Sequence, residues 1–167
     1  MEIRDLYDVN KNLIGKTFIK GEQVPKGYYY LIVAVIIENS NGEFLIQKRV
    51  SRKGGKWALT AGHPKSGESS FEGICSECFE ELGVDISLDN PKLVDTWINN
   101  DQIFDIYYLK KDIGINDIVI QEEEVDGVKY VSLEDINEMN SRGEFHENHF
   151  ILFNKCLQKI GRNIWKS

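Results

Sequence analysis

Residues 28–38, YYYLIVAVIIE, form a continuous apolar and β-branched run that constrains the fold of this chain more than any other segment. A strand that is apolar at every position, rather than at alternate positions, has to be buried on both faces. The turn NSNG at 39–42 and the segment EFLIQKR at 43–49 follow, so we expect the second strand to return beside the first. The chain therefore needs a central sheet that is covered on both sides.

The remaining segments supply strands and helices without a regular βαβ repeat. We expect strands at 3–8 and 14–19 (a small hairpin), 57–60, 92–99, 103–110 and 128–132, and helices at 69–82, from Ser132 onward, and at 144–165. This mixture predicts an α/β fold with a central mixed sheet and helices on both faces. A chain of 167 residues is expected to form one domain, 1–167, with 1–27 as an N-terminal hairpin extension.

Composition excludes several classes of function. The net charge of −7 argues against a surface for a nucleic-acid polymer, which needs clustered Lys and Arg. No segment resembles a secretion signal or a membrane span, and three cysteines do not suggest a disulfide framework. We therefore expect a cytoplasmic protein that does not bind membranes, and a homodimer is compatible with the sequence.

The helix expected at 69–82 carries clear end signals. Ser69 with Glu72 forms a capping box and Gly83 provides the stop. Five residues at helical spacing predict its buried stripe: Phe71, Ile74, Cys75, Cys78 and Leu82. A zinc site at Cys75-x-x-Cys78 would need two further ligands, and nothing in the sequence brings His146, His149 or Cys156 close, so we interpret the cysteines as buried thiols.

Three glutamates crowd the same helix. Glu77 and Glu81 are one turn apart, Glu80 lies beside them, and no Lys or Arg occurs between residues 66 and 91. A solvated acidic face is one interpretation. A site for a hard divalent ion is the other, because Mg²⁺ takes carboxylate oxygens and offsets their repulsion. The Gly62 carbonyl, just upstream of the helix, is a candidate further ligand.

The spacing of these residues resembles the signature of the Nudix hydrolases. The matching residues are Gly62, Glu68, Glu77, Glu80, Glu81 and Gly83, within a box at 62–84. The segments IENSNGEFLIQKR, KWALTAGH and QEEEVDGVKYVSLEDI are also similar to the family. One fixed position departs: Ser76 stands where the signature has Arg. The resemblance implies an α/β/α sandwich in which a loop–helix–loop binds Mg²⁺ or Mn²⁺.

The implied reaction is hydrolysis of a small-molecule diphosphate, commonly a nucleoside diphosphate derivative. By position, Glu77 and Glu81 would be the main metal ligands, with the Gly62 carbonyl, and Glu80 would share a metal or act as base. An extra carboxylate is expected from QEEEV at 121–125; Glu122, Glu123 and Glu124 are the candidates, and we favour Glu123. Cations of the preceding segment are candidates for binding phosphate: Lys48, Arg49, Arg52, Lys53 and Lys56, of which we select Arg49, Arg52 and Lys56 and favour Arg49 most. A solvated basic loop is the alternative.

GHP at 62–64 and the QEEEV segment are typical of a branch similar to isopentenyl-diphosphate isomerase. Ala61 and Tyr30 stand where the isomerase has a catalytic cysteine and a metal-binding histidine, so isomerisation is disfavoured. His63 is either a ligand or a locally bonded loop residue.

Ser76 is the main departure from the family. The family Arg holds nearby carboxylates, and a serine hydroxyl lacks its charge and its fork of donors. Glu68 is expected to lose a counter-charge, and Arg49, Arg52 or Lys56 are candidate replacements. The outcome is either a slower enzyme, which we favour, or a nucleotide-binding module with weak catalysis.

Overall fold

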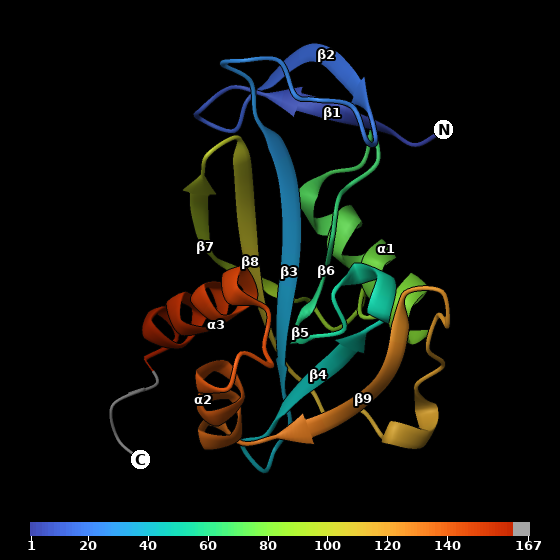
Figure 1. The fold of residues 1–167 in the computed structure, drawn as a ribbon, viewed down its shortest axis with the longest axis vertical. Coiled ribbons are helices and arrows are strands. Elements are labelled where there is room, and N and C mark those ends of the chain that lie inside the picture. The colour runs from blue at the N-terminus through green and yellow to red at the C-terminus, as the bar shows by residue number, and fades with distance from the viewer. Residues whose placement is uncertain (162–167) are drawn as a thin grey trace.

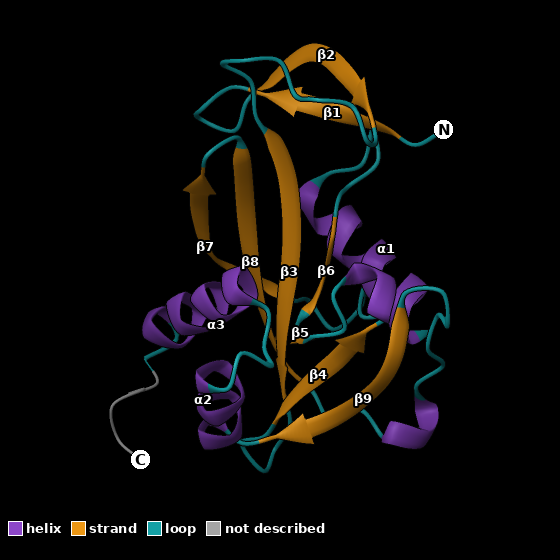
Figure 2. Cartoon of the chain, viewed as in Figure 1, coloured by secondary structure: helices purple, strands orange, loops and turns teal. Residues whose placement is uncertain are grey.

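The apolar run forms β3 (Tyr30–Glu38) at the centre of a seven-stranded mixed sheet (Figures 1 and 2). This computed structural model describes residues 1–161. The strand order is β5-β4-β3-β8-β7, with β6 paired to β3 and β9 paired to β4. The other elements are β1 (Ile3–Tyr7), β2 (Leu13–Ile19), β4 (Phe44–Arg49), β5 (Trp57–Ala58), β6 (Thr60–Gly62), α1 (Ser70–Leu82), β7 (Lys92–Asn99), β8 (Gln102–Lys110), β9 (Val125–Val131), α2 (Leu133–Ser141) and α3 (Glu147–Lys159), with short 3-10 turns at Ser51–Lys53 and Ile115–Asp117.

Successive side chains of β3 enter two separate cores. Even-numbered residues such as Ile32 and Ile36 pack in the core with α2 and α3, whereas odd-numbered residues such as Val33 and Val35 pack in the core with α1. This alternation follows from the period of two along a strand. Burial on both faces and helices on both sides of the sheet are confirmed. None of the helices within residues 1–161 is long and apolar enough to cross a membrane.

The prediction that residues 28–38 and 43–49 pair as a hairpin is wrong beyond the turn. β3 and β4 pair in register only at Glu38 and Phe44, next to the turn itself. β3 instead pairs in parallel with β8 over all nine of its residues, and β6 occupies part of its other edge at Val33–Val35. β4 diverges to pair with β9. A chain turn fixes only the first pair, and the rest depends on long-range packing.

The helix starts follow their capping boxes. Ser69 and Ser132 cap α1 and α2, and Gly83 ends α1 in a left-handed conformation at φ 68°. Within the stripe, Ile74, Cys78 and Leu82 are buried, but Phe71 is 36% exposed. Gly73 lies on the buried face instead, packed so closely against Pro64 that an added Cβ would lie 2.6 Å from it.

The last helix is shorter than expected. The sequence suggested 144–165, whereas α3 begins at Glu147, because Phe145 is held in a parallel bridge to Trp57. Residues 162–165 of the expected helix lie outside the described residues.

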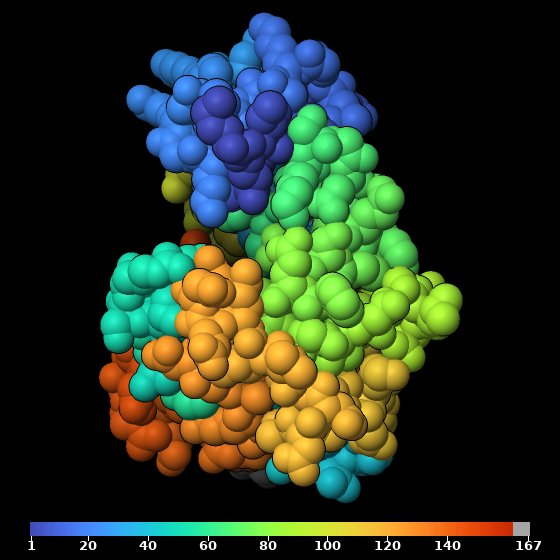
Figure 3. All heavy atoms as spheres, turned by 90° about the vertical axis from the view of Figure 1, so that its right-hand side faces the viewer, coloured from blue at the N-terminus to red at the C-terminus, as the bar shows by residue number. Residues whose placement is uncertain are grey.

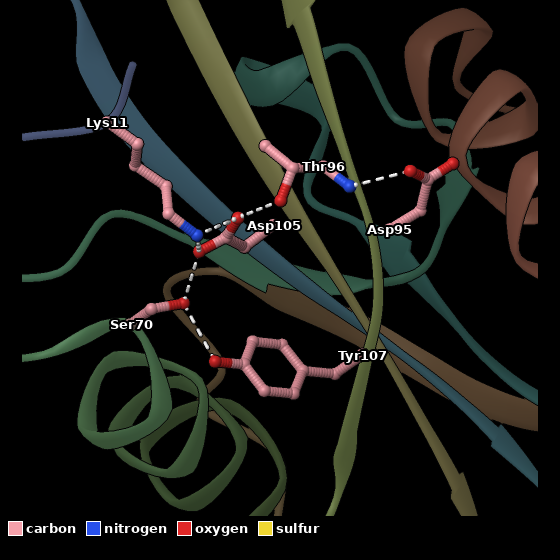
Figure 4. Close-up of polar contacts among 6 residues, drawn as sticks. All are labelled: Lys11, Ser70, Asp95, Thr96, Asp105 and Tyr107. Carbon is pink, nitrogen blue, oxygen red and sulfur yellow. Dashed lines mark hydrogen bonds and ion pairs between the residues drawn. The ribbon is translucent and has the colours of Figure 1, made fainter. Parts of the chain in front are cut away.

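The N-terminal hairpin β1–β2 forms a sheet of its own at the upper end of the molecule in Figure 1. Tyr7 and Tyr29 exchange two backbone hydrogen bonds, and Lys11 reaches the fully buried Asp105 on β8, with 3.0 Å from Nζ to each carboxylate oxygen. Asp105 also accepts hydrogen bonds from Ser70 of α1 and Thr96 of β7 (Figure 4). One buried carboxylate therefore ties the hairpin to the start of α1.

Candidate active site

A cavity of about 460 Å³ lies between the hairpin, α1, the start of β9 and the N-terminus of α3. The space-filling view shows the hollow on this face, with the hairpin above it, residues of the box to one side and the 50–56 and 119–127 segments below (Figure 3). Its size is that of a site for a small molecule. Glu77, Glu80 and Glu81 all line it, and so does Gly62. The structure thus brings the predicted box residues to one wall.

Glu77 packs directly against Gly62. An added Cβ on Gly62 would lie 2.1 Å from the carboxyl carbon of Glu77, so only glycine leaves room for this side chain. Burial is the largest cause that raises the pKa of Glu77 to about 8, and the neighbouring Glu81 and Glu80 raise it further. The fold therefore places the Glu77 carboxyl group where its ionised form is poorly stabilised.

Glu81 is buried at the adjacent turn of α1, with 9% of its surface exposed. Its carboxylate accepts a 3.1 Å hydrogen bond from the amide of Gln47, and Thr60 donates a 2.8 Å bond to the other end of that amide. Burial raises the pKa of Glu81 to about 7, against the lowering effect of Gln47, Lys53 and Arg49. Gln47 was not singled out from the sequence, where it reads as an ordinary position within a strand.

Glu80 and Glu68 are held on the outer side of the box. The Lys65 ammonium lies 2.8 Å from Glu80, and the Lys65 amide donates a 2.7 Å bond to Glu68. Glu68 also accepts a 2.7 Å bond from the hydroxyl of Ser76. The cation that pairs directly with Glu80 is thus Lys65, just outside the 66–91 window, whereas Arg49, one of the three candidates, acts on Glu81 only through its electrostatic field.

Some charged residues of the neighbouring loops line the cavity, and others do not. Arg49 lines the cavity, and so do Lys53 and Glu124, which form an ion pair. The predicted residues Arg52, Lys56 and Glu123 do not line it: Arg52 contacts Glu124 and donates to the Glu123 carbonyl. The turn before β9 points the side chain of Glu124, rather than that of Glu123, toward the box. The carboxylate that the 121–125 segment provides to this cavity is therefore Glu124.

The fit to a divalent metal rests on the chemistry of these donors. Among residues 1–161, no three His, Cys, Asp or Glu side chains already surround a metal position. Carboxylates of Glu77, Glu81 and Glu124 nevertheless line the same cavity, and burial raises the pKa of Glu77 and Glu81, so a bound cation would favour their ionised forms. Glu80 would join them by turning away from Lys65.

His63 and the three cysteines pack against neighbouring residues of the fold. His63 stacks on Tyr30 with ring centroids 5.5 Å apart, and burial lowers its pKa to about 3. Cys78 and Cys156 are buried and Cys75 is half-buried, all three unpaired. The interpretation of Cys75 and Cys78 as structural thiols is favoured, because burial raises the pKa of both.

Comparison with known proteins identifies the fold family. Residues 29–152 match the NUDIX domain. The chain belongs to the Nudix family. The match leaves out the N-terminal hairpin, although this hairpin provides Glu2, Arg4 and Lys20 to the cavity.

Relatives by sequence include a Nudix hydrolase that matches nearly the whole chain, and two more distant proteins. An uncharacterized Nudix hydrolase of Listeria monocytogenes serovar 1/2a is 36% identical over 160 residues, covering 92% of this chain and 95% of the relative. The nucleoside triphosphatase NudI of Enterobacter sp. is 31% identical over 122 residues, covering 65% of this chain and 86% of NudI. An isopentenyl-diphosphate Delta-isomerase of Streptomyces coelicolor is 35% identical over 88 residues, covering 50% of this chain and 45% of the isomerase. This Nudix protein is therefore a hydrolase.

Solved structures confirm the mixed α/β Nudix architecture. DR0079 from Deinococcus radiodurans has a TM-score of 0.74 at 17% identity, covering 92% of this chain and 98% of DR0079. The NUDIX domain of Shewanella oneidensis NrtR, solved with ADP ribose, has a TM-score of 0.66 at 17% identity, covering 86% and 93%.

Proposed function

We propose that this Nudix hydrolase cleaves the diphosphate bond of a nucleoside diphosphate derivative or a similar organic diphosphate, using Mg²⁺ or Mn²⁺. The observation that carries the proposal is the pair Glu77 and Glu81, buried in one cavity wall with raised pKa values beside Arg49 and Lys53. Buried carboxylates with raised pKa values, next to cations suited to phosphate, support binding of a metal–diphosphate. The nucleoside triphosphatase activity in the name of the Enterobacter relative is consistent with this substrate class.

Each residue has a defined part in this proposal. Glu77, Glu81 and the Gly62 carbonyl would hold the metal, with Glu124 as the further carboxylate. When bound, the metal polarises the phosphoryl oxygens and lowers the pKa of the attacking water. Gln47 orients the Glu81 carboxylate through its 3.1 Å hydrogen bond.

The remaining roles concern phosphate and protons. Arg49 and Lys53 would bind the diphosphate oxygens as charge-assisted donors. Glu80 is half-exposed and held by Lys65 alone among the described residues, so it can turn toward the cavity and accept a proton from water. Three unpaired thiols support a reducing compartment, and we propose the cytoplasm.

A substrate panel with each metal tests the proposal. Release of phosphate or nucleoside monophosphate is measured for nucleoside diphosphates, nucleoside triphosphates, sugar nucleotides and dinucleotide polyphosphates, with Mg²⁺, with Mn²⁺ and with chelator. We expect turnover only with a divalent ion, and a loss of about 100-fold or more in Glu81→Gln. Glu134→Gln, on the exposed start of α2, is the matched control.

Two results would contradict the proposal. Metal-dependent activity that survives in Glu81→Gln would overturn the assignment of the box residues. Thermal stabilisation by nucleotides without turnover across the panel would favour the binding module instead. Isomerisation is not favoured, because Ala61 and Tyr30 line the cavity without a thiol or an imidazole at those positions.

A further inference from the structure

Two stacked histidines stand at the N-terminus of α3, on the cavity wall, and the hydrolytic proposal does not use them. His146 is the N-cap of this helix and His149 follows three residues later. Their ring centroids are 4.0 Å apart with an angle of 27° between the ring planes, and both residues line the cavity. His149 is only 8% exposed, so this pair is part of the interior of the wall.

The Nδ1 atoms of both rings accept hydrogen bonds from backbone amides. The His149 amide donates to Nδ1 of His146 at 3.3 Å, and the Leu59 amide donates to Nδ1 of His149 at 3.1 Å. A backbone N–H is always a donor, so each Nδ1 must present its lone pair. In a neutral imidazole the proton then resides on Nε2. The fold therefore fixes one tautomer for both rings.

Both rings are neutral near neutral pH. Burial lowers the pKa of His146 to about 4, and it lowers the pKa of His149 well below the ordinary value of 6.5. Two uncharged Nε2–H donors result. Within residues 1–161 neither Nε2–H has a hydrogen-bond acceptor, and neither Nε2 is among the fully enclosed unpaired atoms, so both donors are open to the cavity, where a ligand oxygen can accept from them.

The charges around the pair favour an anionic oxygen. Arg49 is close enough to affect both histidines electrostatically, and it also affects Glu81 of the box. The N-terminal end of a 13-residue helix adds its positive dipole. Lys56 adds positive potential at His146, and the exposed Glu147 is the opposing charge on the same turn.

We propose that His146 and His149 form a phosphoryl-oxygen subsite, which binds the part of an organic diphosphate that extends past Arg49 from the box glutamates. Each Nε2–H donates one hydrogen bond to an oxygen that has no proton of its own. This subsite rests on the proposed function for the identity of the substrate, but its occupation requires no hydrolysis. It adds two residues from α3 to a site otherwise made by the box and the 47–53 segment.

Imidazole nitrogen NMR tests the subsite in the full chain. With ¹⁵N-labelled histidine, we expect both residues to show the Nε2–H tautomer in the free protein. Methylenediphosphonate, which cannot be hydrolysed, is added with and without Mg²⁺, and uridine is added separately as a source of carbonyl oxygens without phosphate. We expect methylenediphosphonate to shift the Nε2 signals of His146 and His149. Unmoved signals at saturation, or signals moved by uridine alone, would overturn the proposal.

Matched substitutions separate the donor from the structural role of each ring. Asn keeps an acceptor near the position of Nδ1, so His146→Asn retains the helix cap and His149→Asn retains an acceptor for Leu59, while both lose the Nε2–H. We expect each Asn variant to weaken methylenediphosphonate binding about tenfold with little change in Tm. Gln places an amide donor near Nε2 instead, so His146→Gln and His149→Gln should bind better than the Asn variants and melt at lower temperature.

The readouts distinguish this subsite from the proposed function. Asn variants that melt and bind like the wild type would contradict the subsite. If an Asn variant fails to fold, the NMR titration of the wild-type protein decides. Absence of hydrolysis across the substrate panel would remove the proposed reaction, whereas shifted Nε2 signals would still establish phosphoryl binding by the two histidines.

Discussion

The hydroxyl of Ser76 donates a 2.7 Å hydrogen bond to Glu68, eight residues earlier in the chain. Glu68 accepts a second bond of the same length from the Lys65 amide, on its other carboxylate oxygen. The family has Arg at the position of Ser76, so here an uncharged hydroxyl and a backbone amide hold this glutamate. The positive charge lies instead on the Lys65 side chain, which contacts Glu80.

Removal of the Ser76 hydroxyl should mildly weaken both the fold and the activity. Ser76→Ala leaves one oxygen of Glu68 without its donor, and we expect a loss of about 1 kcal/mol in the free energy of unfolding, with a few-fold decrease in kcat. Ser76→Thr keeps a hydroxyl and is the control. Ser76→Arg restores the family residue, and we expect its kcat to equal or exceed that of the wild type. A slower Ser76→Arg enzyme would show that Lys65 and Ser76 act as a matched pair.

Gly62→Ala should impair hydrolysis more than stability. The new methyl group would collide with the Glu77 carboxyl, which is the end of a flexible side chain and can move aside. We therefore expect kcat/KM to fall about 100-fold or more, because Glu77 is displaced, while Tm changes little. Gly127→Ala is the control, since no atom lies within 4 Å of its added Cβ. Equal activity in the two variants would argue against a role for Glu77 at that position.

The stability of the metal-free protein should fall as the pH rises through neutrality. The pKa values of Glu77 and Glu81 are raised from 4.5 to about 8 and about 7, so the folded state binds these protons more tightly than the unfolded state does. Their contribution is complete below the unfolded pKa and is lost as the pH rises through the folded pKa values. Unfolding free energies measured between about pH 7 and pH 8.5 should therefore decrease.

The choice of pH window and two controls isolate this effect. The buried histidines have lowered pKa values, so their contribution is lost only as the pH falls below about 6.5, outside this window. Glu77→Gln should flatten the dependence. Saturating Mg²⁺ should stabilise the protein and reverse the slope, because it binds the ionised carboxylates. A pH-independent unfolding free energy in the metal-free wild type would contradict the burial of these acids.

Removal of the Lys11 ammonium should loosen the N-terminal hairpin. Lys11→Met leaves the fully buried Asp105 with only the hydroxyls of Ser70 and Thr96, and we expect a loss of about 2 kcal/mol in the free energy of unfolding. The double variant Lys11→Met with Asp105→Asn should recover part of this loss, because no buried charge is left unpaired. Limited proteolysis within residues 1–27 gives a second readout. If Lys11→Met is as stable as the wild type, the hydroxyls of Ser70 and Thr96 alone are enough to stabilise the buried Asp105 carboxylate.

Local features of the sequence predicted local structure well. Ser69 with Glu72 and Ser132 with Asp135 mark the two capped helix starts, because a capping box involves only residues three apart. The pairing of β3 with β8, across about 70 residues, has no such local signal. The same holds for Gln47 and Glu124, whose importance follows only from what they contact across the fold.

The sequence by itself determined the family, the box helix and the two-sided burial of β3, because spacing and hydrophobic period are properties of neighbouring residues. Tertiary structure alone decided which loop carboxylate and cations reach the box, that Lys65 meets Glu80, and that Ser76 holds Glu68. It also decided that His146 and His149 present Nε2–H donors, since their tautomers depend on the backbone amides that happen to lie opposite Nδ1. Contacts between distant segments depend on how the layers pack, and no local pattern encodes that packing.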